Sequence, residues 1–250
     1  MGPNIIAIGG GSVESGETLS IDRELVSLTG RSRPKLLFVP TASMDSEEYA
    51  DCIRTEFEDR LDCDVDVLRL LGSDASSDVY QPKLEWADVV YVGGGNTKAM
   101  MGHWRKIGFD LAIRSYLHSG RPAGGLSAGA ICWFRVGNSD WPQYEQIPGL
   151  LTARLDCLGI VDLVACPHTS RESFRIKEFS AMMRTESGIG IGLDDCCAIQ
   201  IRGEEYRILA SMEGAVAHML SKRGDVVVIT EMQPHSDFRE LASLKRGVLS

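Results

Sequence analysis

The residue types best suited to chemistry come together in residues 123–130, which read Ala-Gly-Gly-Leu-Ser-Ala-Gly-Ala and contain Gly-x-Ser-x-Gly centred on Ser127. A serine on a sharp strand-to-helix turn exposes its hydroxyl, and Gly125 and Gly129 leave room for the crowded backbone. The amide of Ala128 then lies at a helix N-terminus and can face developing negative charge. The motif predicts a nucleophile at Ser127, although the same residues also suit a small-residue turn that packs a helix closely on a sheet.

A serine hydroxyl needs an adjacent base, and His168 is the histidine best placed to supply it. It follows the apolar run 161–166 and precedes residues 169–172, a Thr-x-x-Glu capping box that predicts the start of a helix. This position is a strand-to-helix turn on the same sheet edge as Ser127. We therefore expect His168 to be the base, although a lone histidine in such a turn can also be structural. The other histidines lie beside helices, in an apolar run or in the polar C-terminal segment: His103, His118, His218 and His235.

A third, acidic group should orient the imidazole and stabilise its cation. Asp140 lies after the serine and before the histidine, and Glu145 is close to it in the sequence. Asp194 and Asp195 follow the apolar run 189–193, so they could also reach the carboxyl edge of the sheet. Spacing alone does not choose among these four carboxylates.

A second glycine-rich turn, Gly93-Gly94-Gly95-Asn96-Thr97, directly follows the apolar run 88–92. It lacks both the Gly-x-Gly-x-x-Gly spacing and the Lys-Ser/Thr pair of a phosphate-binding loop. Its bare backbone could instead supply a second oxyanion-hole donor beside Ala128. The alternative is a flexible turn in which Asn96 caps the next helix. Residues 9–11, also three glycines, share this ambiguity.

The composition is that of an ordinary water-exposed globule, with 44% hydrophobic and 24% charged residues among 250. A net charge of −9 makes nucleic acid an improbable partner, because phosphate binding needs a basic face. No apolar run approaches the roughly 20 residues of a membrane helix. Seven cysteines without Cys-x-x-Cys favour a reducing cytoplasm. No metal-ligand spacing is visible, so we expect no cofactor. The chain is expected to be a monomer or a homodimer.

Short apolar runs alternate with amphipathic segments along most of the chain, which predicts an α/β fold with a mostly parallel sheet covered by helices on both faces. Strands are expected at 4–8, 35–39, 65–70, 88–92 and before Ser127, and helices at 19–28, from Asp45 onward with Glu48 completing the cap, and at 109–119. The runs 198–201, 206–209 and 226–229 predict antiparallel edge strands that finish the sheet. Residues 234–250 form a terminal helix or a loose end of what we expect to be one domain, 1–250.

Four motifs in this order resemble the peptidase E family of serine peptidases, which includes aspartyl dipeptidases and cyanophycinases. They are the strand followed by Gly-Gly-Gly-Asn-Thr, then Gly-Leu-Ser-Ala-Gly-Ala, then Pro-His, then Gly-Leu-Asp-Asp, between about residues 4 and 220. The resemblance implies a flavodoxin-like fold similar to class I glutamine amidotransferase domains. It implies a triad with Ser127 as nucleophile, His168 as base and Asp140 as first choice of acid. It also implies an oxyanion hole from Gly94, Gly95 and Ala128.

The same resemblance bears on the substrate. In aspartyl dipeptidases an arginine after the histidine reads the substrate carboxylate, and Arg171 and Arg175 occupy a similar segment here. Arg171 is the preferred reader, with Arg175 and Asn96 as further substrate-binding candidates. A guanidinium suits bidentate recognition of a carboxylate. The sequence departs from cyanophycinases at Cys166-Pro167, where those enzymes carry polar substrate-binding residues, and from aspartyl dipeptidases in a shorter connection between His168 and Arg171.

These observations predict a serine peptidase that hydrolyses small peptides, most simply dipeptides with an N-terminal aspartate, through an acyl-enzyme. One alternative is an α/β-hydrolase-type esterase, whose histidine comes late in the chain, as His218 and His235 do. The other is a non-catalytic amidotransferase-like module that binds a metabolite. An amidotransferase proper would need a cysteine nucleophile, and Cys132 lies five residues past the serine, inside the predicted helix.

Overall fold

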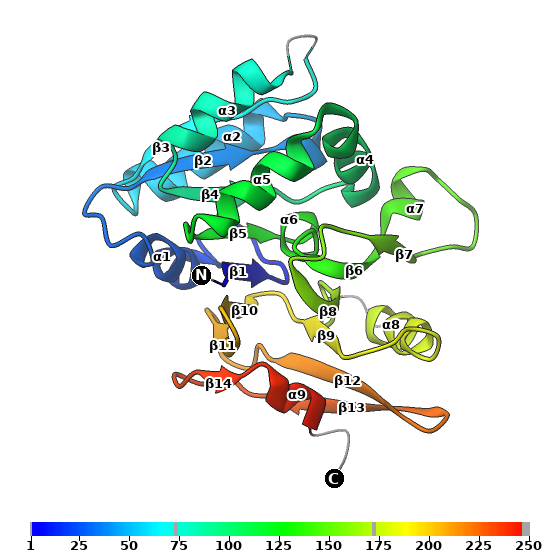
Figure 1. Cartoon of the computed structure of the whole chain (residues 1–250). Helices are drawn as coiled ribbons and strands as arrows, with labels where there is room; N and C mark the ends of the chain where they lie inside the picture. Colours follow the sequence, from blue (N-terminus) through cyan, green and yellow to red (C-terminus); the bar gives the residue numbers. More distant parts are fainter. Residues whose placement is uncertain (1, 73–74, 172–173, 247–250) are drawn as a thin grey trace.

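The computed structural model describes residues 2–72, 75–171 and 174–246 (Figure 1). Two sequence expectations fall partly outside these ranges: Glu172 of the predicted capping box, and the last four residues of the C-terminal segment. The fold is built on two sheets with helices packed against them (Figure 1).

A large sheet has the strand order β14-β11-β10-β1-β5-β4-β2-β3. Its strands are β1 (Asn4–Ile8), β2 (Lys35–Val39), β3 (Asp64–Val67), β4 (Val89–Val92), β5 (Ala123–Leu126), β10 (Cys197–Arg202), β11 (Glu205–Ala210) and β14 (Arg239–Glu240). Strands β1 to β5 pair in parallel, whereas β10, β11 and β14 pair antiparallel at one edge. The predicted α/β fold, with a mostly parallel sheet and antiparallel C-terminal strands, is confirmed.

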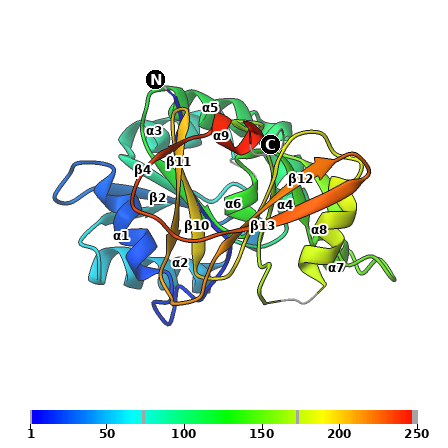
Figure 2. The same ribbon diagram turned by 90° about the horizontal axis from the view of Figure 1, so that it is seen from below.

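Helices cover both faces of this sheet because its buried strands alternate their side chains between two apolar layers (Figures 1 and 2). Ile6 faces the layer that contains α1 and α2, and Ile5 faces the layer that contains α3, α4 and α5. Full burial of one such side chain stabilises the fold by about 1.5–3 kcal/mol. These helices are α1 (Leu19–Ser27), α2 (Glu47–Arg54), α3 (Ser77–Trp86), α4 (Thr97–Ile107) and α5 (Phe109–His118).

A second sheet, with the order β13-β12-β9-β8-β6-β7, was not predicted. Its strands are β6 (Phe134–Ser139), β7 (Ala153–Asp156), β8 (Val161–Cys166), β9 (Gly190–Leu193), β12 (Ala217–Arg223) and β13 (Val226–Met232). The expectation that residues 226–229 complete the large sheet is therefore wrong, because β13 pairs with β12 in the second sheet. An apolar pattern predicts that a strand is buried, but it does not predict which sheet the strand joins.

The central strands of the second sheet, β8 and β9, pack against apolar residues on both faces. Phe179 and Met183 of α8 (Arg175–Met183) cover one face through a small apolar cluster. On the other face, Leu163 and Ile191 join the apolar cluster that also contains Ile5 of the large sheet. One continuous core therefore fixes the two sheets against each other.

This arrangement brings four strand ends together. Ile8 at the end of β1 is in register with Leu126 at the end of β5, and Cys166 at the end of β8 is in register with Gly192 of β9. Loops at the carboxyl ends of neighbouring parallel strands form the usual ligand-binding edge of an open α/β sheet. The remaining helices are α6 (Ala128–Ile131), α7 (Trp141–Tyr144) and α9 (Ala242–Arg246).

Two predicted helix starts are displaced. Ser46, rather than Asp45, caps α2 by accepting a hydrogen bond from the Tyr49 amide at 3.2 Å. Asp45 instead accepts from the Leu71 amide, so its carboxylate ties two loops together. The helix predicted from the capping box at 169–172 begins only at Arg175, because the hydroxyl of the box residue Thr169 binds Asp194.

Candidate active site

Ser127 lies on a strained turn between β5 and α6, as the Gly-x-Ser-x-Gly motif predicts. Its backbone has φ 57° and ψ −107°, a conformation that non-glycine residues rarely adopt. Its N–H donates to the Ile8 carbonyl at 3.0 Å, which fixes the turn against β1. A Cβ on Gly129 would lie 1.9 Å from the Val92 carbonyl oxygen, so this close approach of helix to sheet requires a glycine.

His168 links this serine to a carboxylate. Its Nε2 lies 2.8 Å from Ser127 Oγ, and its Nδ1 lies 2.6 Å from Asp195 Oδ1. The histidine follows β8 with a positive φ of 58°, and its N–H donates to the Gly9 carbonyl at 3.2 Å. A hydroxyl, an imidazole and a carboxylate joined in this order can deprotonate the hydroxyl and stabilise the imidazolium that results.

The glycine loop after β1 makes this geometry possible. A Cβ on Gly10 would lie 1.9 Å from Asp195 Oδ1 and 2.4 Å from His168 Nδ1. The Gly10 carbonyl also accepts from the Cys196 amide at 2.9 Å, which anchors the turn that carries Asp195. Sequence reasoning treated residues 9–11 only as a weak oxyanion-loop candidate and missed this role. Three consecutive glycines directly after a buried strand were the available signal.

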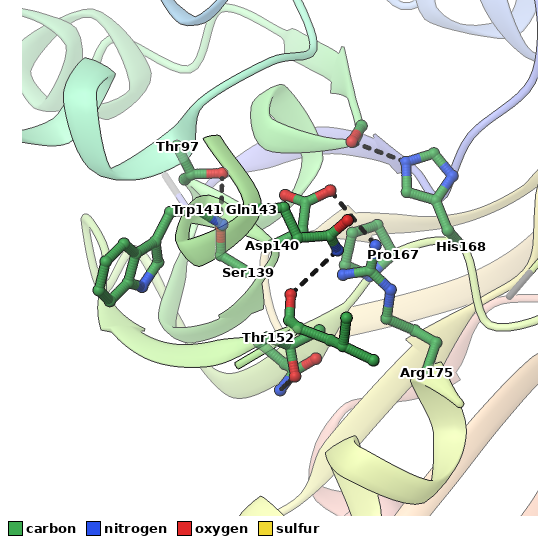
Figure 3. A network of polar contacts seen from close by, with 12 residues as sticks. Thr97, Ser139, Asp140, Trp141, Gln143, Thr152, Pro167, His168 and Arg175 are labelled. Atoms are coloured by element: carbon green, nitrogen blue, oxygen red, sulfur yellow. Dashed lines mark hydrogen bonds and ion pairs between the residues drawn. The ribbon is translucent and has the colours of Figure 1, made fainter. Parts of the chain in front are cut away.

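The structure does not bring the first choice of acid, Asp140, to His168. Its Oδ2 lies 3.3 Å from Nη2 of Arg175, whose side chain is fully buried, and the two groups face each other apart from the His168 ring (Figure 3). Asp140 follows β6 and Asp195 follows β9, and these strands flank β8 on opposite sides. Both acids are thus topological neighbours of His168, whose imidazole binds the one on the β9 side.

The two other carboxylates that the sequence spacing allowed as the acid also bind partners other than His168. Glu145 pairs with Lys98 at 2.8 Å on α4. Asp194 accepts from Thr169 Oγ1 at 2.7 Å and from His218 Nε2 at 3.1 Å, which braces the segments on either side of the His168–Asp195 contact. Burial alone would raise the pKa of Asp194, but these hydrogen bonds outweigh it and hold that pKa below its usual value.

The glycine turn after β4 lies beside the serine, with the Cβ position of Gly94 3.4 Å from Ser127 Cβ. The Gly94 amide donates to the Tyr49 hydroxyl at 3.3 Å. Among the described residues, the amides of Gly95 and Ala128 meet no hydrogen-bond acceptor, so both are available to a ligand. Asn96 Oδ1 accepts from the Ala99 amide at 3.1 Å and caps α4.

A pocket of about 340 Å³ opens on this site, within the range usual for small-ligand sites. Ser127, His168 and the predicted carboxylate reader Arg171 all line it. Arg175 does not, because its buried guanidinium is directed at Asp140 (Figure 3). The remaining lining residues are Gly11, Ser12, Val13, Glu14, Tyr49, Cys52, Gly94, Gly95 and Leu126.

Other features bear on the alternatives drawn from the sequence. His235, one of the two late histidines of the esterase alternative, places its Nδ1 2.8 Å from the Asp237 carbonyl oxygen and its ring against Tyr206. Within residues 2–72, 75–171 and 174–246, no group of three or more His, Cys, Asp or Glu side chains is arranged to hold a metal ion. Over the same ranges, no helix combines the length and the apolar character that a membrane crossing requires.

Comparisons with known proteins agree with this fold. The model of peptidase family S51 matches residues 5–209. The uncharacterized peptidase YgaJ of Bacillus subtilis is 35% identical over 218 residues, which cover 86% of this chain and 90% of that protein. The uncharacterized peptidase PM1590 of Pasteurella multocida is 30% identical over 145 residues, covering 56% of this chain and 67% of that protein.

Two solved structures share the fold. A peptidase from an acI-B1 actinobacterium superposes with a TM-score of 0.74 at 18% identity, covering 96% of this chain and 97% of the other. A putative peptidase E protein from Listeria monocytogenes superposes with a TM-score of 0.64 at 21% identity, covering 83% and 98%. The family match spans the elements that carry Ser127, His168 and Asp195. The chain therefore belongs to peptidase family S51 and is a serine peptidase.

Proposed function

We propose that this serine peptidase cleaves short peptides through an acyl-enzyme formed on Ser127, with His168 as the base and Asp195 as the group that orients it. The observation that carries the proposal is the unbroken hydrogen-bonded line from Ser127 Oγ through the imidazole to Asp195 Oδ1, with distances of 2.8 and 2.6 Å. The strained backbone of Ser127 supports it, because strain at a pocket-lining nucleophile is typical of functional turns.

In the proposed first step, His168 Nε2 takes the hydroxyl proton while Ser127 Oγ attacks the peptide carbonyl carbon. The amides of Gly95 and Ala128 donate to the oxyanion of the tetrahedral intermediate. His168 then returns the proton to the leaving amine, and the C–N bond breaks. Water repeats the sequence on the acyl-enzyme, giving the carboxylate product and the free serine. Gly94 could join the oxyanion hole only by giving up its bond to Tyr49.

For specificity, we propose that Arg171 reads the carboxylate of an N-terminal aspartate. Its side chain lines the pocket beside Ser127 and His168, and none of the described residues forms an ion pair with it. A guanidinium fork matches a carboxylate through two parallel hydrogen bonds. The other two substrate-binding candidates from the sequence are held elsewhere: Arg175 is buried against Asp140, and Asn96 caps α4.

A panel of free dipeptides tests this proposal, with Asp-Leu, Glu-Leu, Gly-Leu and Leu-Leu as members. We expect the wild type to prefer Asp-Leu and Ser127→Ala to be inactive. Arg171→Ala should lower kcat/KM for Asp-Leu by about ten- to a hundredfold and leave Gly-Leu nearly unchanged, because a lost charged hydrogen bond costs about 1.5–3 kcal/mol. Equal losses on all four peptides would contradict the role of Arg171. Failure of a fluorophosphonate to label Ser127 would favour the metabolite-binding alternative.

A further inference from the structure

A second charged residue, Glu14, lines the active-site pocket. Neither the proposed serine chemistry nor the proposed role of Arg171 gives it a function. Among the lining residues, Glu14 and Arg171 are the ones with formal charges of opposite sign. No described residue forms a hydrogen bond or ion pair with the Glu14 carboxylate, and Glu14 and Arg171 are not paired with each other. The pocket beside Ser127 therefore presents one anion and one cation that have no ion-pair partner among the described residues.

The loop that carries Glu14 is held in place by its backbone. Arg60 Nη2 donates to the Glu14 carbonyl at 3.3 Å, and Arg60 Nη1 pairs with the buried Glu56 at 2.7 Å. At the start of the loop, the Ser12 amide donates to Glu17 Oε2 at 2.7 Å, and Val13 is buried. The loop is thus anchored independently of the Glu14 carboxylate, which remains available for a ligand.

Glu14 shares the pocket wall with Cys52. Cys52 lines the same pocket from α2, and its thiol pKa is raised, first by burial and then by the nearby carboxylate of Glu14. Glu48 and Asp51 contribute further to this effect, but neither lines the pocket. Among the lining residues that the structure describes, Glu14 is therefore the one that carries a carboxylate.

We infer that Glu14 binds the free α-ammonium group of the substrate's N-terminal residue while Arg171 binds its carboxylate. The inference rests on the proposed function, in which Ser127 attacks a peptide carbonyl in this pocket. An N-terminal aspartate carries its ammonium group on the Cα next to the scissile carbonyl and its carboxylate on the adjoining Cβ, so one anionic and one cationic group on the pocket wall match it. The substrate class is then short peptides with a free, protonated N-terminus, and a blocked amine would leave the Glu14 carboxylate without a partner.

Paired substrates and an isosteric variant test this assignment. We expect the wild type to hydrolyse Asp-Leu at least tenfold faster than N-acetyl-Asp-Leu in kcat/KM. Glu14→Gln should lower kcat/KM for Asp-Leu by about ten- to a hundredfold and change that for N-acetyl-Asp-Leu by less than about twofold. Glu48→Gln is the matched control, because it removes an exposed carboxylate near Cys52 that does not line the pocket. It should leave both substrates nearly unaffected.

A binding measurement separates this inference from the proposed function. Calorimetric titration of both peptides into Ser127→Ala needs no turnover. Tighter binding of Asp-Leu than of N-acetyl-Asp-Leu, abolished by adding Glu14→Gln, supports the assignment even if the wild type cleaves neither peptide and the proposed function fails. Equal binding of the two peptides, or an equal loss for both in Glu14→Gln, would overturn the assignment even if Asp-Leu is cleaved.

Discussion

At the scale of single residues, the active site depends on positions where the backbone approaches closely. Ser127 and His168 both have positive φ, and Gly10 leaves the space that the His168–Asp195 contact fills. Each of these features lies on a turn after a buried strand. The triad candidates are therefore held by main-chain geometry as much as by their own side-chain contacts.

Gly10→Ala tests this dependence on backbone space. The added methyl would lie 1.9 Å from Asp195 Oδ1, so the carboxylate and the imidazole must move apart. We expect kcat to fall by at least about a hundredfold, because a displacement of about 1 Å in a catalytic group costs that much. Steady-state kinetics measures the loss, and circular dichroism checks that the variant is folded.

Gly102→Ala is the control. It lies at an exposed position of α4, where the added carbon would meet no atom within 4 Å outside its own helix backbone, and it should keep wild-type kcat. Unchanged kcat in Gly10→Ala would contradict the account.

At the scale of elements, most of the fold could be predicted because buried strands and amphipathic helices leave periodic patterns. The strands at 4–8 and 35–39 have the predicted bounds, and the predicted antiparallel strands β10 and β11 are confirmed. The helix predicted at 169–172 begins later because Thr169 bonds to Asp194, a contact between elements that no local pattern contains. Local capping signals fail where a tertiary partner competes for the same hydroxyl.

Helix α1 buries a carboxyl group against the large sheet, which should make stability depend on pH. Asp22 is fully buried and accepts from Thr18 Oγ1 at 2.6 Å, and burial, reinforced by Glu56, raises its pKa to about 8. In the unfolded chain an aspartate has a pKa near 3.9. Between these values the folded chain holds a proton that the unfolded chain releases, so this group costs stability progressively as pH rises from about 4 to 8.

We therefore expect Asp22→Asn to gain stability relative to the wild type as pH rises through this window. The gain should approach about 1.4 kcal/mol per pH unit, since the amide has no proton to lose. Denaturant unfolding at pH 5 and pH 7.5 measures it. Asp59→Asn, which removes an exposed carboxylate, should change the free energy of unfolding by less than about 0.5 kcal/mol. If the difference in unfolding free energy between Asp22→Asn and wild type is the same at both pH values, the prediction is wrong.

At the scale of the whole molecule, the site forms where two sheets meet, and this explains which parts of it sequence could predict. Local motifs predict the serine and histidine turns. No local motif identifies the acid, because β6 and β9 flank β8 and place Asp140 and Asp195 on opposite sides of it. Only the assembled sheets show that the fully buried Arg175 binds Asp140, whereas His168 faces Asp195. The second sheet itself left no pattern distinct from that of the first.

The account's central claim is that Asp195, rather than Asp140, orients the base of this serine peptidase, and matched variants of the two acids test it most directly. Measured as kcat on the best peptide substrate, Asp195→Asn should lose up to about 10⁴-fold, because an amide cannot stabilise the imidazolium. Asp140→Asn should stay within about tenfold of wild type, while its unfolding free energy falls by roughly 3 kcal/mol because the Arg175 guanidinium loses a charged partner in the interior. Near-normal kcat in Asp195→Asn together with a 10⁴-fold loss in Asp140→Asn would contradict the claim.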